Sequence, residues 1–407
     1  MRKVLLLLLL AGLALPGHAA KRVTVQQLEQ LVAAIHDKPD ADVASKLSQL
    51  ELIEQLDPVR TERLRKSLPG TRTQDALLAL ADASVFVGLP ASEIPTLPAP
   101  DADAQRQLLD SAGLYAAQTL SKLPNFFATR ETTLFMDSPP IPGRMTVPAE
   151  QSMQFAEEFS ATVFYRNGKQ IAETVNRKGK ISDVAPKGLV TSGEFGPILG
   201  TLLADAHRGE LVWSHWERGA AGQRAVFRYS VPKEESHYKA EFCCVSMNGG
   251  RGVFKRLSGY HGEITIDPET GTILRLTMQA DLKPPYPMTR ADLMVEYGPV
   301  EIGGKTYICP MKSVAIARGY EPAKPIGMKG KPDDWGGLLV LEDEADGVSD
   351  GPEILQTMLN HVVFRQYHLF RSETRILSGD DEDPKANPPA PVPSSAAPAT
   401  PPAVPPQ

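Results

Sequence analysis

The chain has 407 residues, a hydrophobic fraction of 42% and a formal net charge of −6. The charge is modest and no basic run occurs, which argues against nucleic acid as a partner. The length is sufficient for two folded domains.

Residues 1–19 have the pattern of a secretory signal peptide. Arg2 and Lys3 precede an apolar run, and Gly17 and Ala19 occupy the two positions that a signal peptidase recognises. The apolar run is too short to span a bilayer as a helix. Since no later stretch is apolar for long enough to cross a membrane, we expect a periplasmic or secreted mature protein without a transmembrane segment.

Residues 20–122 carry apolar residues at helical spacing and are predicted to form a helical region. Thr24, with Gln27 three residues later, predicts a capping box, and Asp57 before Pro58 predicts a second helix start. Further helices are predicted over TQDALLALADASVFV and AQRQLLDSAGLYAAQTLSKLP, on either side of a proline-rich break. Short amphipathic helices of this kind must pack on one another to be stable.

Residues 123–378 change to a period of two, which predicts an antiparallel β domain. Asn167 and Gly168 predict a tight hairpin turn, and one helix is expected from Phe195 to Ala206. In chain order, the predicted strands lie in the segments EFSATVFYRNGKQIAETV, ELVWSHWER, RAVFRYSV, HYKAEFCCVSM, GYHGEITI, TILRLTMQAD, ADLMVEYG, KTYICPMKSVAIAR and NHVVFRQYHLFRSETRIL. The predicted fold class is therefore α+β: a helical region followed by a curved, half-barrel-like antiparallel sheet that one or two helices cross.

The strands on either side of the turn at residues 267–271 alternate between an apolar and a polar face. Gly271 is expected to take a positive φ in this turn. His261, Glu263 and Thr265 belong to the polar face and are predicted to be solvated. The apolar face forms a wall that we expect to contact an apolar ligand, and its members are Tyr260, Ile264, Leu274, Leu276, Met278, Leu293 and Val295. Such a wall must be covered, either by helices that fill the core or by a curled sheet that leaves a cavity.

The segment WSHWER and the long segment 319–350 supply further candidate residues. Trp213 and Trp335 are predicted to contact a ligand. His215 beside Glu217 has the composition of a general base held by a carboxylate. A contact on the sheet surface is the favoured interpretation of that pair.

Three cysteines, Cys243, Cys244 and Cys309, allow one disulfide in an oxidising compartment. Cys244 is in phase with the more apolar side of its strand and is the preferred partner of Cys309. Three reduced, buried thiols are the alternative. Adjacent cysteines lack the spacing of zinc ligands, and the acidic segment 342–353 is interpreted as a solvated loop, so no metal is predicted. No cofactor is predicted, because the chain has no phosphate loop or dinucleotide fingerprint.

Several phrases in series resemble an uncharacterised family of exported proteins common in Acidobacteria. They are LPNFFATRET, TSGEFGPILGTLLAD, LVWSHWERGAAGQRAVFRYSVP, IDPETGTILRLTMQAD, VEYGPVEIGGKTYICPMKSV and VFRQYHLFRSETRI. The resemblance covers about residues 120–377 and implies no activity, so it adds no functional residues. At fold level, a helix followed by a curved meander is similar to outer-membrane lipoprotein carriers, by analogy alone.

The last segment, residues 379–407, is rich in proline and alanine and is predicted to be a disordered tail. As a whole, the sequence favours a non-enzymatic binding or carrier module for an apolar or lipid-like ligand in the cell envelope. The alternative is an envelope assembly protein with a filled core, which binds protein partners through its helical region. A third interpretation is a hydrolase that uses His215 and Glu217.

Overall fold

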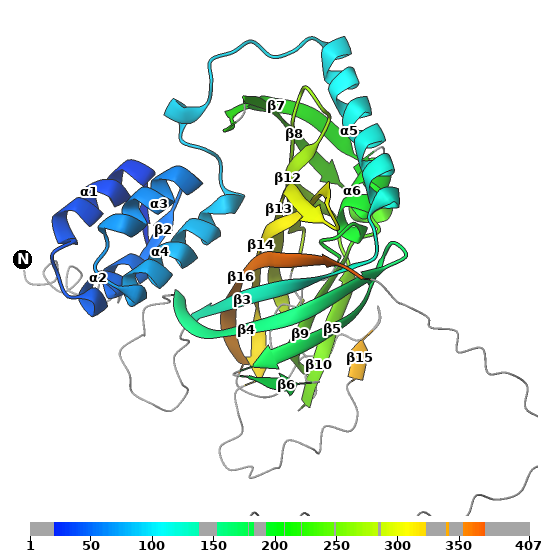
Figure 1. Cartoon of the computed structure of the whole chain (residues 1–407). Coiled ribbons are helices and arrows are strands. Elements are labelled where there is room, and N and C mark those ends of the chain that lie inside the picture. Colours follow the sequence, from blue (N-terminus) through cyan, green and yellow to red (C-terminus); the bar gives the residue numbers. More distant parts are fainter. Residues whose placement is uncertain are drawn as a thin grey trace, which may run out of the picture. The chain divides into compact units, whose positions relative to one another are not determined.

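A computed structural model of the chain (Figure 1) describes residues 20–137, 153–177, 179–182, 193–206, 208–220, 222–247, 250–283, 286–322, 339–341 and 353–370. It shows a mixed α+β fold with a large antiparallel sheet, which confirms the predicted class at this level. The predicted signal peptide and the predicted proline-rich tail lie outside the described residues. Among the helices that the structure describes, none is both long and apolar enough to span a bilayer.

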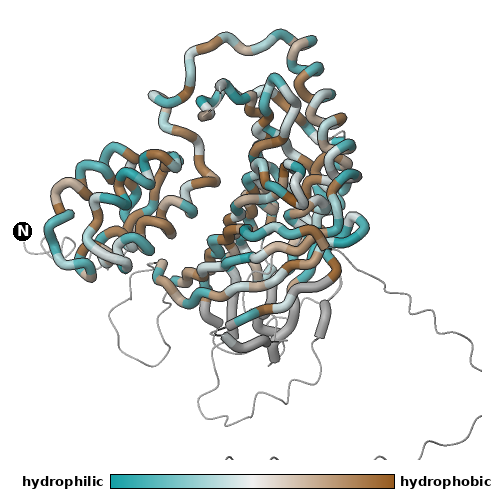
Figure 2. Tube along the Cα trace, viewed as in Figure 1, coloured by the Kyte–Doolittle hydropathy of each residue, from teal (hydrophilic) through white to brown (hydrophobic). Residues whose placement is uncertain are grey.

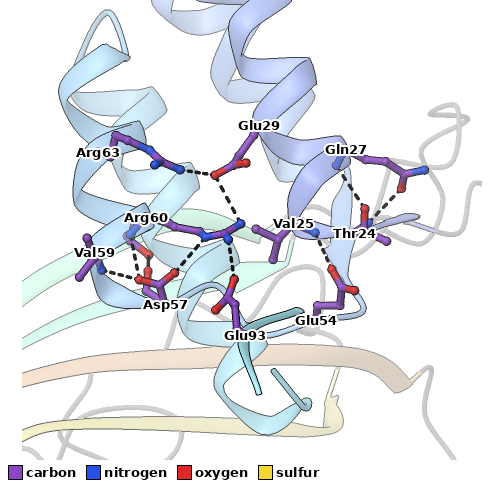
Figure 3. Close-up of polar contacts among 11 residues, drawn as sticks. Thr24, Val25, Gln27, Glu29, Glu54, Asp57, Val59, Arg60, Arg63 and Glu93 are labelled. Carbon is purple, nitrogen blue, oxygen red and sulfur yellow. Dashed lines mark hydrogen bonds and ion pairs between the residues drawn. The ribbon is translucent and has the colours of Figure 1, made fainter. Parts of the chain in front are cut away.

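The first part of the described chain is mainly helical. The helices of the structure are α1 (Val25–Ile35), α2 (Asp40–Ser48), α3 (Pro58–Ser67), α4 (Thr71–Ala83), α5 (Ala102–Lys122) and α6 (Pro197–Ala206), and the short 3₁₀ turns are η1 (Ser84–Phe86), η2 (Ala91–Glu93) and η3 (Lys233–Glu235). The hydroxyl of Thr24 accepts a hydrogen bond from the Gln27 backbone N–H at 3.2 Å, and the Gln27 side chain accepts one in return at 2.9 Å (Figure 3). The Asp57 carboxylate accepts from the backbone N–H groups of Val59 and Arg60. Both predicted helix caps are therefore confirmed.

Helices α1–α4 pack around a core of their own. Its largest fully buried members come from three of these helices, and they are Leu28, Leu47 and Leu77. A short parallel pair that the sequence did not predict, β1 (Lys21–Val23) with β2 (Leu50–Leu52), lies in the same region. Figure 2 shows apolar residues recurring between polar ones along these helices, which is the pattern of amphipathic helices that bury one side.

An ionic network centred on Arg60 joins α1, α3 and η2 (Figure 3). The guanidinium of Arg60 lies 2.8 Å from the Glu93 carboxylate and 3.6 Å from that of Glu29. Asp57, the cap of the same helix, lies 3.2 Å away. A guanidinium has five donors in a fixed plane and can bind several carboxylates at once, so one side chain links three elements.

The strands form one sheet of 11 and a smaller one of three. The strands are β3 (Phe126–Asp137), β4 (Met153–Arg166), β5 (Lys169–Arg177), β6 (Lys180–Ser182), β7 (Glu210–Arg218), β8 (Gln223–Val231), β9 (Lys239–Met247), β10 (Gly250–Leu257), β11 (Tyr260–Ile266), β12 (Ile273–Ala280), β13 (Met288–Ile302), β14 (Lys305–Pro322), β15 (Leu339–Leu341) and β16 (Glu353–Leu369). The larger sheet has the order β6-β5-β4-β3-β16-β14-β13-β12-β11-β8-β7, and the smaller one has the order β15-β10-β9. Strands β3, β6 and β10 were not among the predicted strands.

The predicted turns are present. Asn167 and Gly168, between β4 and β5, have φ values of 51° and 78°, as a two-residue hairpin turn requires. Gly271, between β11 and β12, has a φ of 71°. Both turns were predicted from residue types that tolerate a positive φ, and the structure confirms them.

The larger sheet is covered on both faces, which we name by residues of β11. On the Tyr260 face, the apolar residues of β8, β11, β12 and β13 are buried together with residues of α5 and α6. On the His261 face, Met294, Val314 and Ile316 are buried with Ala79 of α4. The prediction that the second face is solvated is therefore wrong in the middle of the sheet, where α4 and η1 cover it. Thr265, predicted to be solvated, is fully buried.

Candidate functional site

The predicted apolar wall exists, and the chain's own side chains cover it. Of the wall residues, six are buried in a single cluster: Tyr260, Ile264, Leu276, Met278, Leu293 and Val295. The same cluster contains Ala112 and Ala116 of α5 and Leu199 and Leu202 of α6. Small alanine side chains let α5 approach the sheet closely, and the larger leucines of α6 fill the remaining space. Because Leu276 and Met278 have no exposed surface, nothing in the described wall remains open beside them.

One predicted wall residue, Leu274, lies outside this cluster. The pairing of β11 with β12 shifts between Thr265 and Ile266, so that Ile266 pairs with Ile273 while Thr265 pairs with Arg275. Leu274 is the extra residue of the resulting bulge and is half-buried. Ile273 takes the core position that the simple alternation gave to Leu274.

Tyr260 has a polar anchor at the edge of the wall. Its hydroxyl donates to Oδ2 of Asp205 at 2.9 Å, and the backbone N–H of His237 donates to the same oxygen at 2.9 Å. Asp205 is fully buried at the end of α6. Burial and the neighbouring carboxylate raise the pKa of Tyr260 well above its ordinary value. Through Asp205, the tyrosine links α6 and the β8–β9 connection to the sheet. This structural role explains why Tyr260 is buried, and no ligand is needed to explain it.

Trp213 lies at the margin of the same cluster. Its ring centroid is 4.9 Å from that of Trp216 and 5.3 Å from that of Phe227. Trp216 donates its indole N–H to the carbonyl of Pro98 at 2.9 Å and so holds the segment that leads into α5. Trp213 is thus a packing residue in this structure. Trp335, the other aromatic residue predicted to contact a ligand, lies outside the described residues.

His215 and Glu217 share the His261 face, but they do not form the predicted pair. The pairing of β7 with β8 shifts between Trp213 and His215, so the side chains of Trp213 and His215 point to opposite faces of the sheet. Two hydrogen bonds of 3.1 and 2.6 Å join the Glu217 carboxylate to the guanidinium of Arg275. His215 Nδ1 lies 2.9 Å from the Ser214 hydroxyl, and its buried Nε2 has no hydrogen-bond partner among the described residues. Burial lowers the pKa of His215, which keeps the imidazole neutral at pH 7.

Cys309 is a free, buried thiol on β14, so the predicted disulfide with Cys244 is absent from this structure. It packs among aromatic residues, which include Phe126, Tyr165 and Phe195. Burial raises the pKa of the Cys309 thiol to about 12, so the thiolate needed for disulfide exchange is suppressed. The side chain of Cys244 lies outside the described residues, as does the acidic segment 342–352.

A row of polar side chains crosses the His261 face near the edge of the sheet. In the strand register, Glu210 of β7 pairs with Ser230 of β8, Ser230 pairs with His261 of β11, and His261 pairs with Gln279 of β12. Directly paired residues on adjacent strands point to the same face, with their Cβ atoms about 4.5–5.5 Å apart. Four adjacent strands thus present four hydrogen-bonding groups in one line, which we call the polar row (Glu210, Ser230, His261 and Gln279).

The polar row forms one side of a cleft. The cleft encloses about 390 Å³, within the usual range for sites that bind small molecules. The segment 85–88, which comprises the last two residues of η1 and the two residues after them, forms the opposite side with Val85, Phe86 and Val87. The remaining lining comes from the strands beneath, and it comprises Val212, Arg228, Tyr229, Gly262, Glu263 and Thr277. A polar floor and an apolar cover therefore face each other across a space that a small ligand can occupy.

The ionisable side chains of the cleft are mostly paired. Arg228 Nε lies 3.0 Å from Oε1 of Glu263, and His261 Nδ1 lies 2.8 Å from Oδ1 of Asp281. Glu210, at the exposed end of the row, forms no ion pair with any described residue. Among the described residues, no group of three or more His, Cys, Asp or Glu side chains is arranged to hold a metal ion. The cleft is thus a site for hydrogen bonding with a small excess of negative charge.

Two residues of this cleft, His261 and Glu263, were expected from the sequence to lie on the polar face of the sheet. His261 is half-exposed, in line with the expectation of a solvated histidine, but it faces a cleft and is held by Asp281. No local pattern could have shown that the segment 85–88 returns over β8 and β11. The cleft is the product of a contact between segments that are far apart in the chain.

Comparison with known proteins identifies no relative. No protein-family model, no curated protein and no solved structure matches the chain. The resemblance to exported acidobacterial proteins and the analogy with lipoprotein carriers stay predictions.

Proposed function

We propose that the chain is an exported, non-enzymatic binding protein of the cell envelope, and that a small ligand binds in the cleft between the polar row and segment 85–88. The observation that carries this proposal is the cleft itself: about 390 Å³ in which hydrogen-bonding groups from four strands face Phe86 and its apolar neighbours. Concave sites with an apolar wall and a few convergent polar groups are where small ligands usually bind.

This proposal moves the ligand from the Tyr260 face to the His261 face. The wall that the sequence singled out is filled by α5 and α6, so a guest there would have to displace Ala112 or Ala116. A half-barrel-like curvature of the sheet, with these two helices across its inside, is part of the same proposal. A binding role is favoured over hydrolysis because Arg275 binds the Glu217 carboxylate, and His215 has no acidic hydrogen-bond partner among the described residues.

The proposal is tested by screening the full chain against a library of small polar fragments with ligand-observed NMR. The variant Ser230→Tyr places a bulky ring in the middle of the polar row. The control variant Thr306→Tyr introduces the same ring at an exposed position of β14 that does not line the cleft. We expect fragment signals that persist in Thr306→Tyr and vanish in Ser230→Tyr. Signals that survive equally in both variants, or an absence of binding to the folded protein, would contradict a ligand site at the cleft.

A filled core also favours a second candidate, an envelope assembly protein that binds other proteins. The observation behind it is that Leu276, Met278 and Val295 are fully buried, as expected of a core that only stabilises the fold and binds no ligand. Crosslinking in the native envelope should then recover one protein partner in constant ratio to the chain. A crosslinking pattern without a recurring partner would count against this candidate.

A further inference from the structure

Most ionisable side chains of the cleft already have a partner within the protein. Arg228 and Glu263 form a pair of 3.0 Å, and His261 and Asp281 form a pair of 2.8 Å. A fully charged ligand would have to compete with these contacts for its partner. Each pair still has unused hydrogen-bonding capacity, because a guanidinium carries five donors and a carboxylate about four acceptor sites. A ligand group that both donates and accepts hydrogen bonds can therefore bind to either pair without breaking the contact within it.

The polar row repeats the same chemistry at regular intervals. Glu210 accepts hydrogen bonds, Ser230 donates and accepts, and Gln279 does both through its amide. Adjacent strands lie about 4.8 Å apart, so the four groups of the row extend over about 14 Å. A line of this length offers successive contacts to a ligand whose own polar groups are distributed along its edge.

The opposite side of the cleft supplies an apolar surface. Val85, Phe86 and Val87 line it, and Val212, which is 45% exposed, lies on the strand side. The Cζ of Arg290 lies 5.6 Å from the centroid of the Phe86 ring, which restrains the ring. The ligand should therefore have one polar edge and one apolar face.

We infer that the cleft binds a neutral, hydroxyl-rich ring, that is, a saccharide unit. Hydroxyl groups both donate and accept, so they match the polar row, the Arg228–Glu263 ion pair and the hydrogen-bonded pair of His261 and Asp281. The C–H face of a sugar ring matches Phe86 and the valines. The carboxylate of Glu210, which forms no ion pair with the residues that the structure describes, accepts from hydroxyls and repels anions. This inference rests on the proposed binding function and narrows it to one class of ligand.

The test uses three probes on the full chain: N-acetylglucosamine with its β-1,4-linked disaccharide, butylammonium and butyrate. Binding is measured by saturation-transfer NMR and titration calorimetry. We expect saccharide binding that Ser230→Tyr abolishes and Thr306→Tyr leaves unchanged. Gln279→Ala, which removes one neutral hydrogen-bonding group, should raise the Kd by roughly 2- to 10-fold. The monosaccharide and disaccharide arms distinguish a free sugar from a unit of a longer glycan.

The outcomes separate the two proposals. Binding of butylammonium or butyrate that depends on Ser230, without saccharide binding, overturns the saccharide inference and leaves the cleft as a ligand site. Saccharide binding that is equal in Ser230→Tyr and Thr306→Tyr also overturns the inference, since the sugar then binds elsewhere. Failure of all probes and of the fragment library, with both variants folded by circular dichroism, overturns the inference and the proposed function together.

Discussion

Asp82 at the end of α4 and Lys312 on β14 form an ion pair in which Oδ1 lies 2.7 Å from Nζ. The carboxylate is 1% exposed, and its other oxygen, Oδ2, lies 2.7 Å from Nδ1 of His361 on β16. Both partners belong to the sheet, so this carboxylate docks α4 on the His261 face. Since α4 leads directly into η1, the same contact positions the apolar side of the cleft.

Replacing Asp82 with Asn should be strongly destabilising. The change leaves the ammonium of Lys312 partly buried without its counter-charge, and breaking such a pair costs roughly 3–5 kcal/mol of unfolding free energy. Urea unfolding measures this difference. Asp103→Asn is the matched control, because Asp103 pairs with Arg106 on the exposed surface of α5, where a salt bridge contributes only about 0–1 kcal/mol. Equal, small losses in both variants would show that the buried pair does not hold α4.

The same carboxylate should make stability depend on acid pH. Burial alone would raise the pKa of Asp82, but attraction to Lys312 and the hydrogen bond to His361 outweigh it and lower the pKa below the ordinary value of 3.8. A carboxyl group with a depressed folded-state pKa adds stability above its unfolded pKa and loses it as the pH falls through the folded value. The stability gap between wild type and Asp82→Asn should therefore narrow below about pH 4. A gap that widens in acid would contradict the assigned direction of the shift.

The filled wall predicts unequal costs for two neighbouring leucines. Leu276→Ala should lose roughly 2–5 kcal/mol of unfolding free energy, because it opens a void among side chains that have no room to collapse. Leu274→Ala removes the same atoms from a half-buried bulge and should cost clearly less. Thermal and denaturant unfolding of the two variants gives the comparison. If Leu276→Ala proved as mild as Leu274→Ala, the wall would be open, and the apolar-ligand hypothesis would regain its basis.

Local chemistry explains what the sequence predicted correctly. The caps at Thr24 and Asp57 depend on residues within three positions along the chain, and the turn at Gly168 depends on two neighbours. Such signals are complete within a short window and need no knowledge of the rest of the fold. The alternation of β11 and β12 has the same local character, which is why most of the wall could be read from the sequence.

The predictions that were wrong concern residues whose register or burial depends on a segment far away in the chain. The bulges at Ser214 and Leu274 shift the alternation by one residue, and each is defined by the register of a partner strand. Thr265 alternates as a solvated residue should, yet it is fully buried, on a face that α4 and η1 partly cover. These two elements come from a part of the chain that the sequence assigned to a separate region. His261 is half-exposed, as predicted, but the cleft beside it could not be predicted from the sequence, because segment 85–88 is far from β11 along the chain.

Two glycines with nearly equal φ angles allow the cost of backbone strain to be measured separately from the cost of a steric clash. At Gly168, which has a φ of 78°, an added Cβ would have no atom of the described residues within 4 Å. At Gly271, which has a φ of 71°, it would lie 2.7 Å from the carbonyl oxygen of Ser111 on α5. Gly168→Ala should cost about 1–2 kcal/mol of unfolding free energy for the left-handed conformation alone. Gly271→Ala should cost more, because it also pushes α5 away from the turn.

Hydrogen exchange of the α5 amides distinguishes the two effects. We expect these amides to exchange faster in Gly271→Ala and at the wild-type rate in Gly168→Ala, because only the first change disturbs the contact with Ser111. Equal stability losses with unchanged α5 exchange would mean that the turn between β11 and β12 does not support α5. In that event the packing of Ala112 and Ala116 would have to hold α5 on the Tyr260 face without help from the turn.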